Sequence, residues 1–204
     1  MKKKVAFCTY DAPLFYGPNT WLKRLLADLN KKDFSIQVLI FYEGNLDECN
    51  ACQYFNSLGL YVDTFPFKSI TQDKIIWILK TLASNPPDVF VPNMLVGALY
   101  AARWIKKAGI PTVGVMHSDD KFYDAVTRVF VNGDQEYKLS AFITCSKFLF
   151  KKVKATKPSN IIIDTIAYGS PTENIPSTVF DDNKLKLILC GKTGRKTKKN
   201  NGKW

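Results

Sequence analysis

The only histidine of the chain, His117, is followed directly by Ser118, Asp119 and Asp120. A neutral imidazole can hydrogen-bond a sugar hydroxyl or a phosphate oxygen, and carboxylates suit polyol recognition or general-base catalysis. The structural alternative is that Ser118 or Asp119 caps a following helix while Asp120 is only solvated. These four residues by themselves favour neither interpretation.

A second candidate is the segment 11–20, DAPLFYGPNT, which contains one glycine, Gly17. It matches neither GxGxxG nor GxxxxGK[ST], so it is no dinucleotide fingerprint and no P-loop. A glycine-containing loop before a helix can still approach a phosphate, because the free N–H groups and the helix dipole favour an anion. The sequence alone favours the alternative, an ordinary loop in which Asn19 or Thr20 caps the helix.

The cysteines give little sign of metal chemistry. Cys49 and Cys52 form a single CxxC, which is weak support for zinc or redox chemistry without a second pair or a nearby histidine. Cys8, Cys145 and Cys190 lie in apolar runs and are expected to be small buried residues. We therefore expect no metal site.

Apolar runs typical of strands alternate with stretches of helical periodicity. The expected strands are 4–10, 35–42, 61–67, 86–93, 111–117, 139–146 and 160–170. The expected helices are 19–32, 71–84, 95–109, 123–131 and 147–155. Strands that are apolar on both faces and alternate with helices predict an α/β fold with a doubly wound, mostly parallel, Rossmann-like sheet.

Such sheets bind ligands outside the carboxyl ends of their strands, near the point where the strand order reverses. His117 follows one expected strand and therefore belongs to this edge. Asn93 ends the preceding strand and would lie close to His117 if the two strands are neighbours. The structural alternative for Asn93 is a turn residue.

The basic charge of the chain is concentrated at its end. The formal net charge is +11, but the last 13 residues, KTGRKTKKNNGKW, hold six of the 29 basic residues and no acid, which leaves 23 basic against 18 acidic residues, a net of +5, in the rest. An anionic partner is thus expected of the tail and not of the body, and nucleic acid is not the expected partner.

The pattern predicts one main domain. We expect a Rossmann-like domain over 1–171, a polar linker over 172–183, a strand over 184–191 that opens a second unit, and a disordered basic tail over 192–204. The apolar run 5–10 is too short for a signal peptide, and no stretch approaches the ~18 apolar residues of a membrane span. We therefore expect a cytoplasmic protein, with an anionic membrane surface at the inner membrane face as a candidate partner.

Several segments, taken in order, resemble a known family. They are KVAFCTYDAPLFYGPNTWLKRLLADL, PPDVFVPN, GALYAARWIKKAGIPTVGVMHSDD, AFITCSKFLFKKV and IIIDTIAYGSP. Over about residues 4–191 the chain resembles the N-terminal, acceptor-side domain of family 4 glycosyltransferases of the GT-B fold. At IAYGSP it departs from the family's usual Asn-Gly-Val-Asp turn, with Tyr168 at one of the changed positions.

The resemblance implies roles for individual residues. Gly17 matches the loop that approaches the nucleotide-sugar phosphates, and His117 matches the strand-end histidine that faces the sugar, which makes it the candidate catalytic residue. Asn93 replaces a second histidine of the family's pattern, and Ser146 matches a small polar residue at the next strand end. The other expected substrate-binding residues are Asn19, Ser118 and Asp119.

The resemblance also implies an activity. It is the transfer of a sugar from a nucleotide sugar to a glycan or lipid acceptor, without a metal or other cofactor, because such folds stabilise the leaving diphosphate with a helix dipole and basic residues. The donor domain is almost entirely missing after 185–191, so the chain alone is expected to be truncated and inactive. The alternative is a non-enzymatic module whose basic tail binds an anionic surface or nucleic acid.

Overall fold

The structure is a computed structural model that describes residues 2–11, 17–30 and 34–169. These residues belong to one compact unit that ends at Gly169. The expected linker 172–183, strand 184–191 and basic tail 192–204 lie outside the described residues. No helix in the described part is long and apolar enough to cross a membrane.

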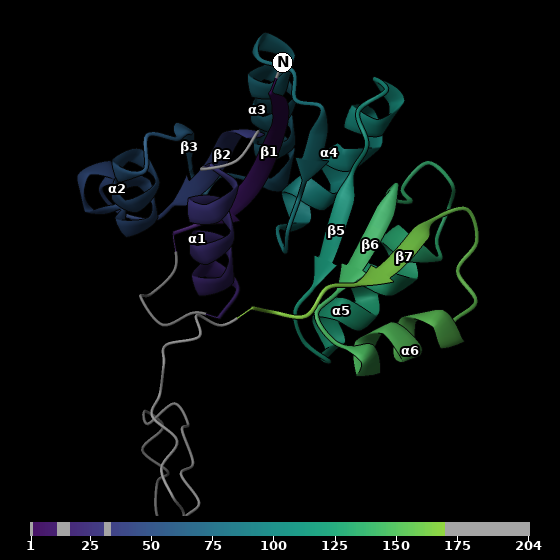
Figure 1. Cartoon of the computed structure of the whole chain (residues 1–204). Helices are drawn as coiled ribbons and strands as arrows, with labels where there is room; N and C mark the ends of the chain where they lie inside the picture. The colour runs from purple at the N-terminus through teal and green to yellow at the C-terminus, as the bar shows by residue number, and fades with distance from the viewer. Residues whose placement is uncertain (1, 12–16, 31–33, 170–204) are drawn as a thin grey trace, which may run out of the picture. The chain divides into compact units, whose positions relative to one another are not determined.

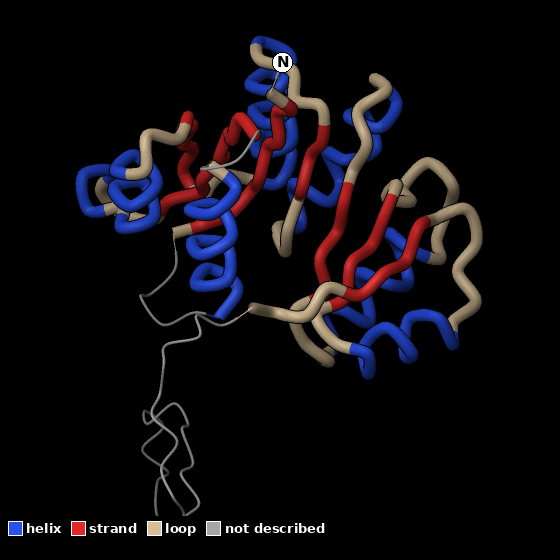
Figure 2. Tube along the Cα trace, in the orientation of Figure 1, coloured by secondary structure: helices blue, strands red, loops and turns tan. Residues whose placement is uncertain are grey.

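The strands of the described residues pair in parallel, in the orders β3-β2-β1-β4 and β5-β6-β7. Their bounds are Lys3–Tyr10 (β1), Phe34–Tyr42 (β2), Tyr61–Pro66 (β3), Val89–Val91 (β4), Val113–Met116 (β5), Ala141–Thr144 (β6) and Ile162–Thr165 (β7). A single parallel bridge between Phe90 and Thr112 joins the two groups, and the N–H of Phe90 donates to Pro111 O at 2.9 Å. These strands therefore lie side by side in the order β3-β2-β1-β4-β5-β6-β7 (Figures 1 and 2).

Helices cover the strands from both faces, as a doubly wound fold requires. Their bounds are Gly17–Leu29 (α1), Asn50–Ser57 (α2), Thr71–Ser84 (α3), Val96–Lys107 (α4), Lys121–Val126 (α5) and Lys147–Ala155 (α6), with a 3₁₀ turn at Leu46–Glu48 and a π-helical turn at Thr127–Val131. Successive side chains of β1 point to opposite faces of the sheet and so belong to different hydrophobic clusters. Val5 and Phe7 pack with α1 and α2, whereas Ala6 and Cys8 pack in the cluster that includes α3 to α6. The predicted α/β fold class is confirmed.

The topology creates a switch point at β1. This strand lies between β2 and β4, so the chain builds outward to β3 and then returns to the other side of β1. The residues that follow β1, β4 and β5 therefore meet at one edge, and they include Asp11, Asn93 and His117.

Candidate functional site

His117 follows β5 and is held at both ring nitrogens. Its Nε2 lies 2.7 Å from the side-chain oxygen of Asn93, and its Nδ1 is hydrogen-bonded to the hydroxyl of Tyr168. Because the Asn93 oxygen can only accept, Nε2 carries the proton and Nδ1 accepts from the phenol. Tyr168, His117 and Asn93 thus form a chain of two hydrogen bonds that selects one neutral tautomer.

Burial keeps this imidazole uncharged. Desolvation lowers the pKa of His117 from 6.5 to about 4, because a charged ring loses more hydration than a neutral one. At neutral pH the group is therefore a hydrogen-bonding imidazole and not a cation.

Aromatic rings surround His117. The ring of Trp21 from α1 lies 5.0 Å from the His117 ring in an edge arrangement, and the Tyr168 ring lies 5.9 Å from both. Tyr123 from α5 lies at 6.2 Å. The spacing of Trp21 with Leu22 and Leu25 predicts only a core helix face, so the sequence did not reveal its part in the site.

Asn93 combines an unusual backbone with an unused donor. Its φ of 51° lies in the left-handed region, which asparagine tolerates better than most residues. The side chain is 2% exposed, and its Nδ2 has no hydrogen-bond partner among the described residues. A buried amide donor without a partner costs about 1–3 kcal/mol, and the oxygen of a bound water or of a ligand would satisfy it.

The two candidate residues at the start of α1, Asn19 and Gly17, differ in exposure. Asn19 is buried and ties α1 to β1: its oxygen accepts from the Thr9 hydroxyl at 3.1 Å, and its amide donates to Tyr10 O at 2.9 Å. Its predicted contact with substrate stays a prediction. Gly17 is exposed, and an added Cβ there would meet nothing within 4 Å. Residues 12–16 of the same loop lie outside the described residues.

The acidic residues after His117 have structural partners. Asp120 caps α5 by accepting from the N–H of Tyr123 at 3.0 Å, and Ser118 donates to Asp120 at 2.6 Å. The alternative that Ser118 or Asp119 is the cap is therefore wrong, because the chain turns helical one residue later. The hydrogen bond from Ser118 is the main cause that lowers the pKa of Asp120. Asp119 pairs with Lys152.

The next strand end carries a helix cap. Ser146 accepts from the N–H of Leu149 at 3.2 Å and so begins α6. Cys145 is partly exposed, which differs from its expected burial, and its thiol lies 3.5 Å from His117 O. The substrate-binding role predicted for Ser146 stays a prediction.

The CxxC forms a disulfide. Cys49 and Cys52 are bonded at the start of α2, where Cys49 is the cap. The Asp11 carboxylate accepts from the N–H of Ala51 at 2.9 Å and links the end of β1 to this helix. Within the described residues, no three His, Cys, Asp or Glu side chains gather in a way that could hold a metal ion.

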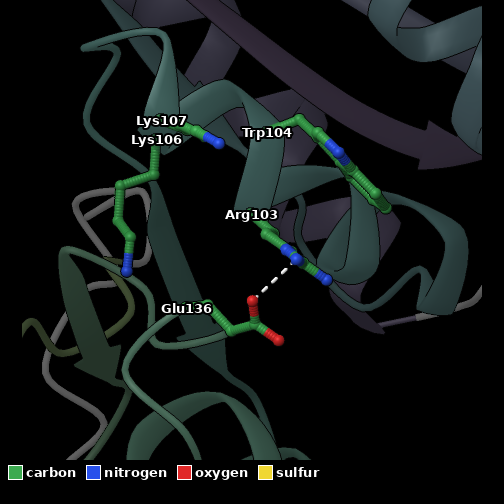
Figure 3. Close-up of a pocket in the computed structure, with 5 residues that line it drawn as sticks. All are labelled: Arg103, Trp104, Lys106, Lys107 and Glu136. Atoms are coloured by element: carbon green, nitrogen blue, oxygen red, sulfur yellow. Dashed lines mark ion pairs between the residues drawn. The ribbon is translucent and has the colours of Figure 1, made fainter.

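A pocket lies at the end of α4, away from His117 (Figure 3). It is lined by Arg103, Trp104, Lys106, Lys107 and Glu136. Arg103 pairs with Glu136 at 2.6 Å. Since α4 begins after β4 and ends before β5, this pocket lies at the amino ends of the strands, and the switch-point rule does not select it.

Comparison with known proteins identifies the fold. No family model and no curated protein matches the chain. Among solved structures, the lipopolysaccharide outer core galactosyltransferase WaaB in its apo form matches with a TM-score of 0.63 at 12% identity, over 89% of this chain and 50% of that one. The chain has a GT-B-like fold.

Epimerases share this fold. The UDP-GlcNAc 2-epimerase of Methanocaldococcus jannaschii, in complex with UDP-GlcNAc and UDP, matches with a TM-score of 0.56 at 16% identity, over 78% of this chain and 45% of that one. Another UDP-N-acetylglucosamine 2-epimerase gives 0.55 at 10% identity, over 80% and 47%. The GT-B-like chain therefore spans about half the length of the solved structures that it matches.

Proposed function

We propose that this chain is the acceptor-side half of a glycosyltransferase related to GT-B family 4. It would act in the transfer of a sugar from a nucleotide sugar to a glycan or lipid acceptor. The observation that carries the proposal is the pair of His117 and Asn93, 2.7 Å apart at the strand ends beside the switch point. The GT-B-like fold, which carries nucleotide-sugar enzymes among its solved members, supports the ligand class.

Each residue has a role in this proposal. His117, neutral and fixed in one tautomer, positions a sugar hydroxyl by accepting its proton in a hydrogen bond at Nδ1. To make this hydrogen bond, the sugar hydroxyl replaces the Tyr168 hydroxyl as the donor to Nδ1 of His117. Asn93 holds the opposite side of the ring and offers its unused Nδ2 donor to a ligand oxygen. Trp21 forms an apolar wall against which a sugar ring can pack.

Sugar transfer requires a second domain that closes the other side of the site. Catalysis needs reactants held in one geometry and protected from water, and the chain spans about half of its structural neighbours. We propose that the other half supplies most of the nucleotide site, and that this chain alone binds ligand without turnover. No metal is required, because helix dipoles and basic side chains can stabilise a leaving diphosphate.

The single histidine allows a direct test. We would label the imidazole with ¹⁵N and ¹³C and titrate the protein with UDP-, GDP- and ADP-sugars, each up to about 10 mM, the range expected for half a site. At least one nucleotide sugar should shift the His117 ring signals, and Asn93→Ala should weaken that binding about tenfold.

The matched control is Asn132→Ala, which removes another side-chain amide, the one bonded to the Thr156 hydroxyl at 2.9 Å. This variant should bind as the parent does. If no nucleotide sugar moves the His117 signals, or if both asparagine variants weaken binding equally, the proposed site is wrong.

A further inference from the structure

Helix α6 presents lysines on the side opposite its buried face. Leu149 and Val153 pack into the core, four residues apart. Lys147, Lys151 and Lys154 follow the same spacing on the opposite side of the helix and are exposed, because residues at i, i+4 and i+7 share one face. The outer face of α6 is therefore a row of positive charge.

These charges are not neutralised locally. Residues 147–157 contain five lysines and no acid. Lys152 alone pairs with Asp119 and with Asp124, the latter at 2.7 Å. Within the part of the chain that the structure describes, no ion pair involves Lys147, Lys151 or Lys154. Lys154 lies over the Phe150 ring, 5.6 Å from its centroid, but a ring carries no net charge, so the positive charge of all three lysines is left for an external anion.

Phe148 stands at the edge of this row. It is 64% exposed, among the most exposed of the large apolar side chains in the described residues. Its position one residue after Lys147 places it beside Lys151 on the next turn. A large apolar ring beside a row of lysine side chains matches the interfacial pattern of membrane-surface helices, in which the ring enters the headgroup region and the ammonium groups stay in water.

We propose that the outer face of α6, formed by Lys147, Phe148, Lys151 and Lys154, docks on an anionic lipid bilayer. The three lysines lie along one exposed face of a helix, and such a face meets a plane more readily than it encloses a polynucleotide strand. Cations near an anionic bilayer each contribute attraction, and the Phe148 ring adds apolar burial that a phosphate backbone does not offer.

The lysine row on α6 begins at the same edge of the sheet as the candidate site. Ser146 caps α6 directly after β6, so Lys147 and Phe148 lie at the carboxyl edge of the strands, the edge that also carries His117. Docking there would bring the bilayer to the side of the molecule that holds the candidate site. The inference does not depend on the proposed sugar chemistry.

The test uses the full chain and sedimentation with vesicles of about one part phosphatidylglycerol to two parts phosphatidylcholine. Each lysine contributes about a fivefold change, so the triple variant Lys147→Gln, Lys151→Gln, Lys154→Gln should bind about 100-fold more weakly. Phe148→Ala should weaken binding about fivefold or more. Vesicles of phosphatidylcholine alone should bind none of the proteins strongly.

The control triple variant removes the same charge elsewhere, at the exposed Lys68, Lys80 and Lys107. The control for Phe148 is Trp104→Ala, at a residue that is 43% exposed. Both controls should keep most of the binding, and the basic tail is common to all variants. If the α6 triple variant binds like its control, or if Phe148→Ala binds like the parent, the proposal is wrong. Tighter binding to a single-stranded polynucleotide than to vesicles would overturn it in favour of nucleic acid if that binding falls in the α6 triple variant but not in the control triple variant or in Phe148→Ala.

Discussion

His117 should make the stability of the protein depend on pH. Its pKa is about 4 in the folded protein, against an ordinary value of 6.5, so between these pH values the unfolded chain binds the extra proton. Stability therefore rises with pH through this window and is lost as pH falls. We expect the wild type to lose about 2 kcal/mol more than His117→Gln between pH 7 and pH 5. Urea unfolding of both proteins at the two pH values measures this difference, and equal losses would show that the ring titrates normally.

Tyr168 should tune that pKa. Its hydroxyl donates to Nδ1 and so stabilises the neutral ring, because a hydrogen bond to one protonation state favours that state. In Tyr168→Phe the ring stays but the donor is lost, so the pKa of His117 should rise. The single imidazole is followed by NMR, with Tyr61→Phe, at a 56% exposed position, as the control. An unchanged His117 pKa in Tyr168→Phe would show that the phenol does not bond the ring in solution.

At the scale of residues, the sequence predicted that His117 and Asn93 lie close together, but not which aromatic rings surround them. His117 and Asn93 follow directly from strand ends, since parallel strands bring their carboxyl ends together. Trp21 has the spacing of any buried helix residue, and Tyr168 comes 51 residues after His117. Only the three-dimensional arrangement shows that these rings meet. Asn19 and Ser146 have the right types for binding, but both also hold helix ends or strands in place.

At the scale of elements, periodicity predicted the strands and most helices. The strand ends were less accurate: the expected 86–93 is only Val89–Val91 in the structure, because Pro92 has no N–H and Asn93 is left-handed. Helix α2 was not predicted. Its residues, NACQYFNS, carry a short apolar pattern, and the disulfide and the Asp11 contact that fix its first turn are not visible in the periodicity.

Helix α5 gives a test at this scale. Asp120 accepts from the N–H of Tyr123 and is its side-chain cap, so Asp120→Ala should lower the free energy of unfolding by about 1 kcal/mol. Asp119→Ala removes an exposed ion pair with Lys152 and should cost less. Chemical denaturation of both variants and of Ser118→Ala ranks the three residues. A larger loss for Asp119→Ala than for Asp120→Ala would contradict the assignment of the cap.

At the scale of the whole molecule, two of the places where positive charge gathers, the α6 row and the last 13 residues, have different properties. The α6 row is fixed on a folded helix beside an exposed phenylalanine. The last 13 residues hold six basic residues and no apolar periodicity, apart from a final Trp204. A fixed amphipathic face suits a bilayer, whereas a run of cations without an apolar face attracts any polyanion.

Deletion of 192–204 separates these two sources. It removes six cations, and each neutralised phosphate contributes about −0.7 to the slope of log K against log salt for a single strand. Binding of the full chain to single-stranded polynucleotide should therefore be strongly salt-dependent and should nearly vanish in the deletion variant. Binding to anionic vesicles should fall less, and the His117 response to nucleotide sugars should not change. If the deletion leaves polynucleotide binding intact, the folded domain and not the tail holds the polyanion, and the site at α6 would have to be reassigned.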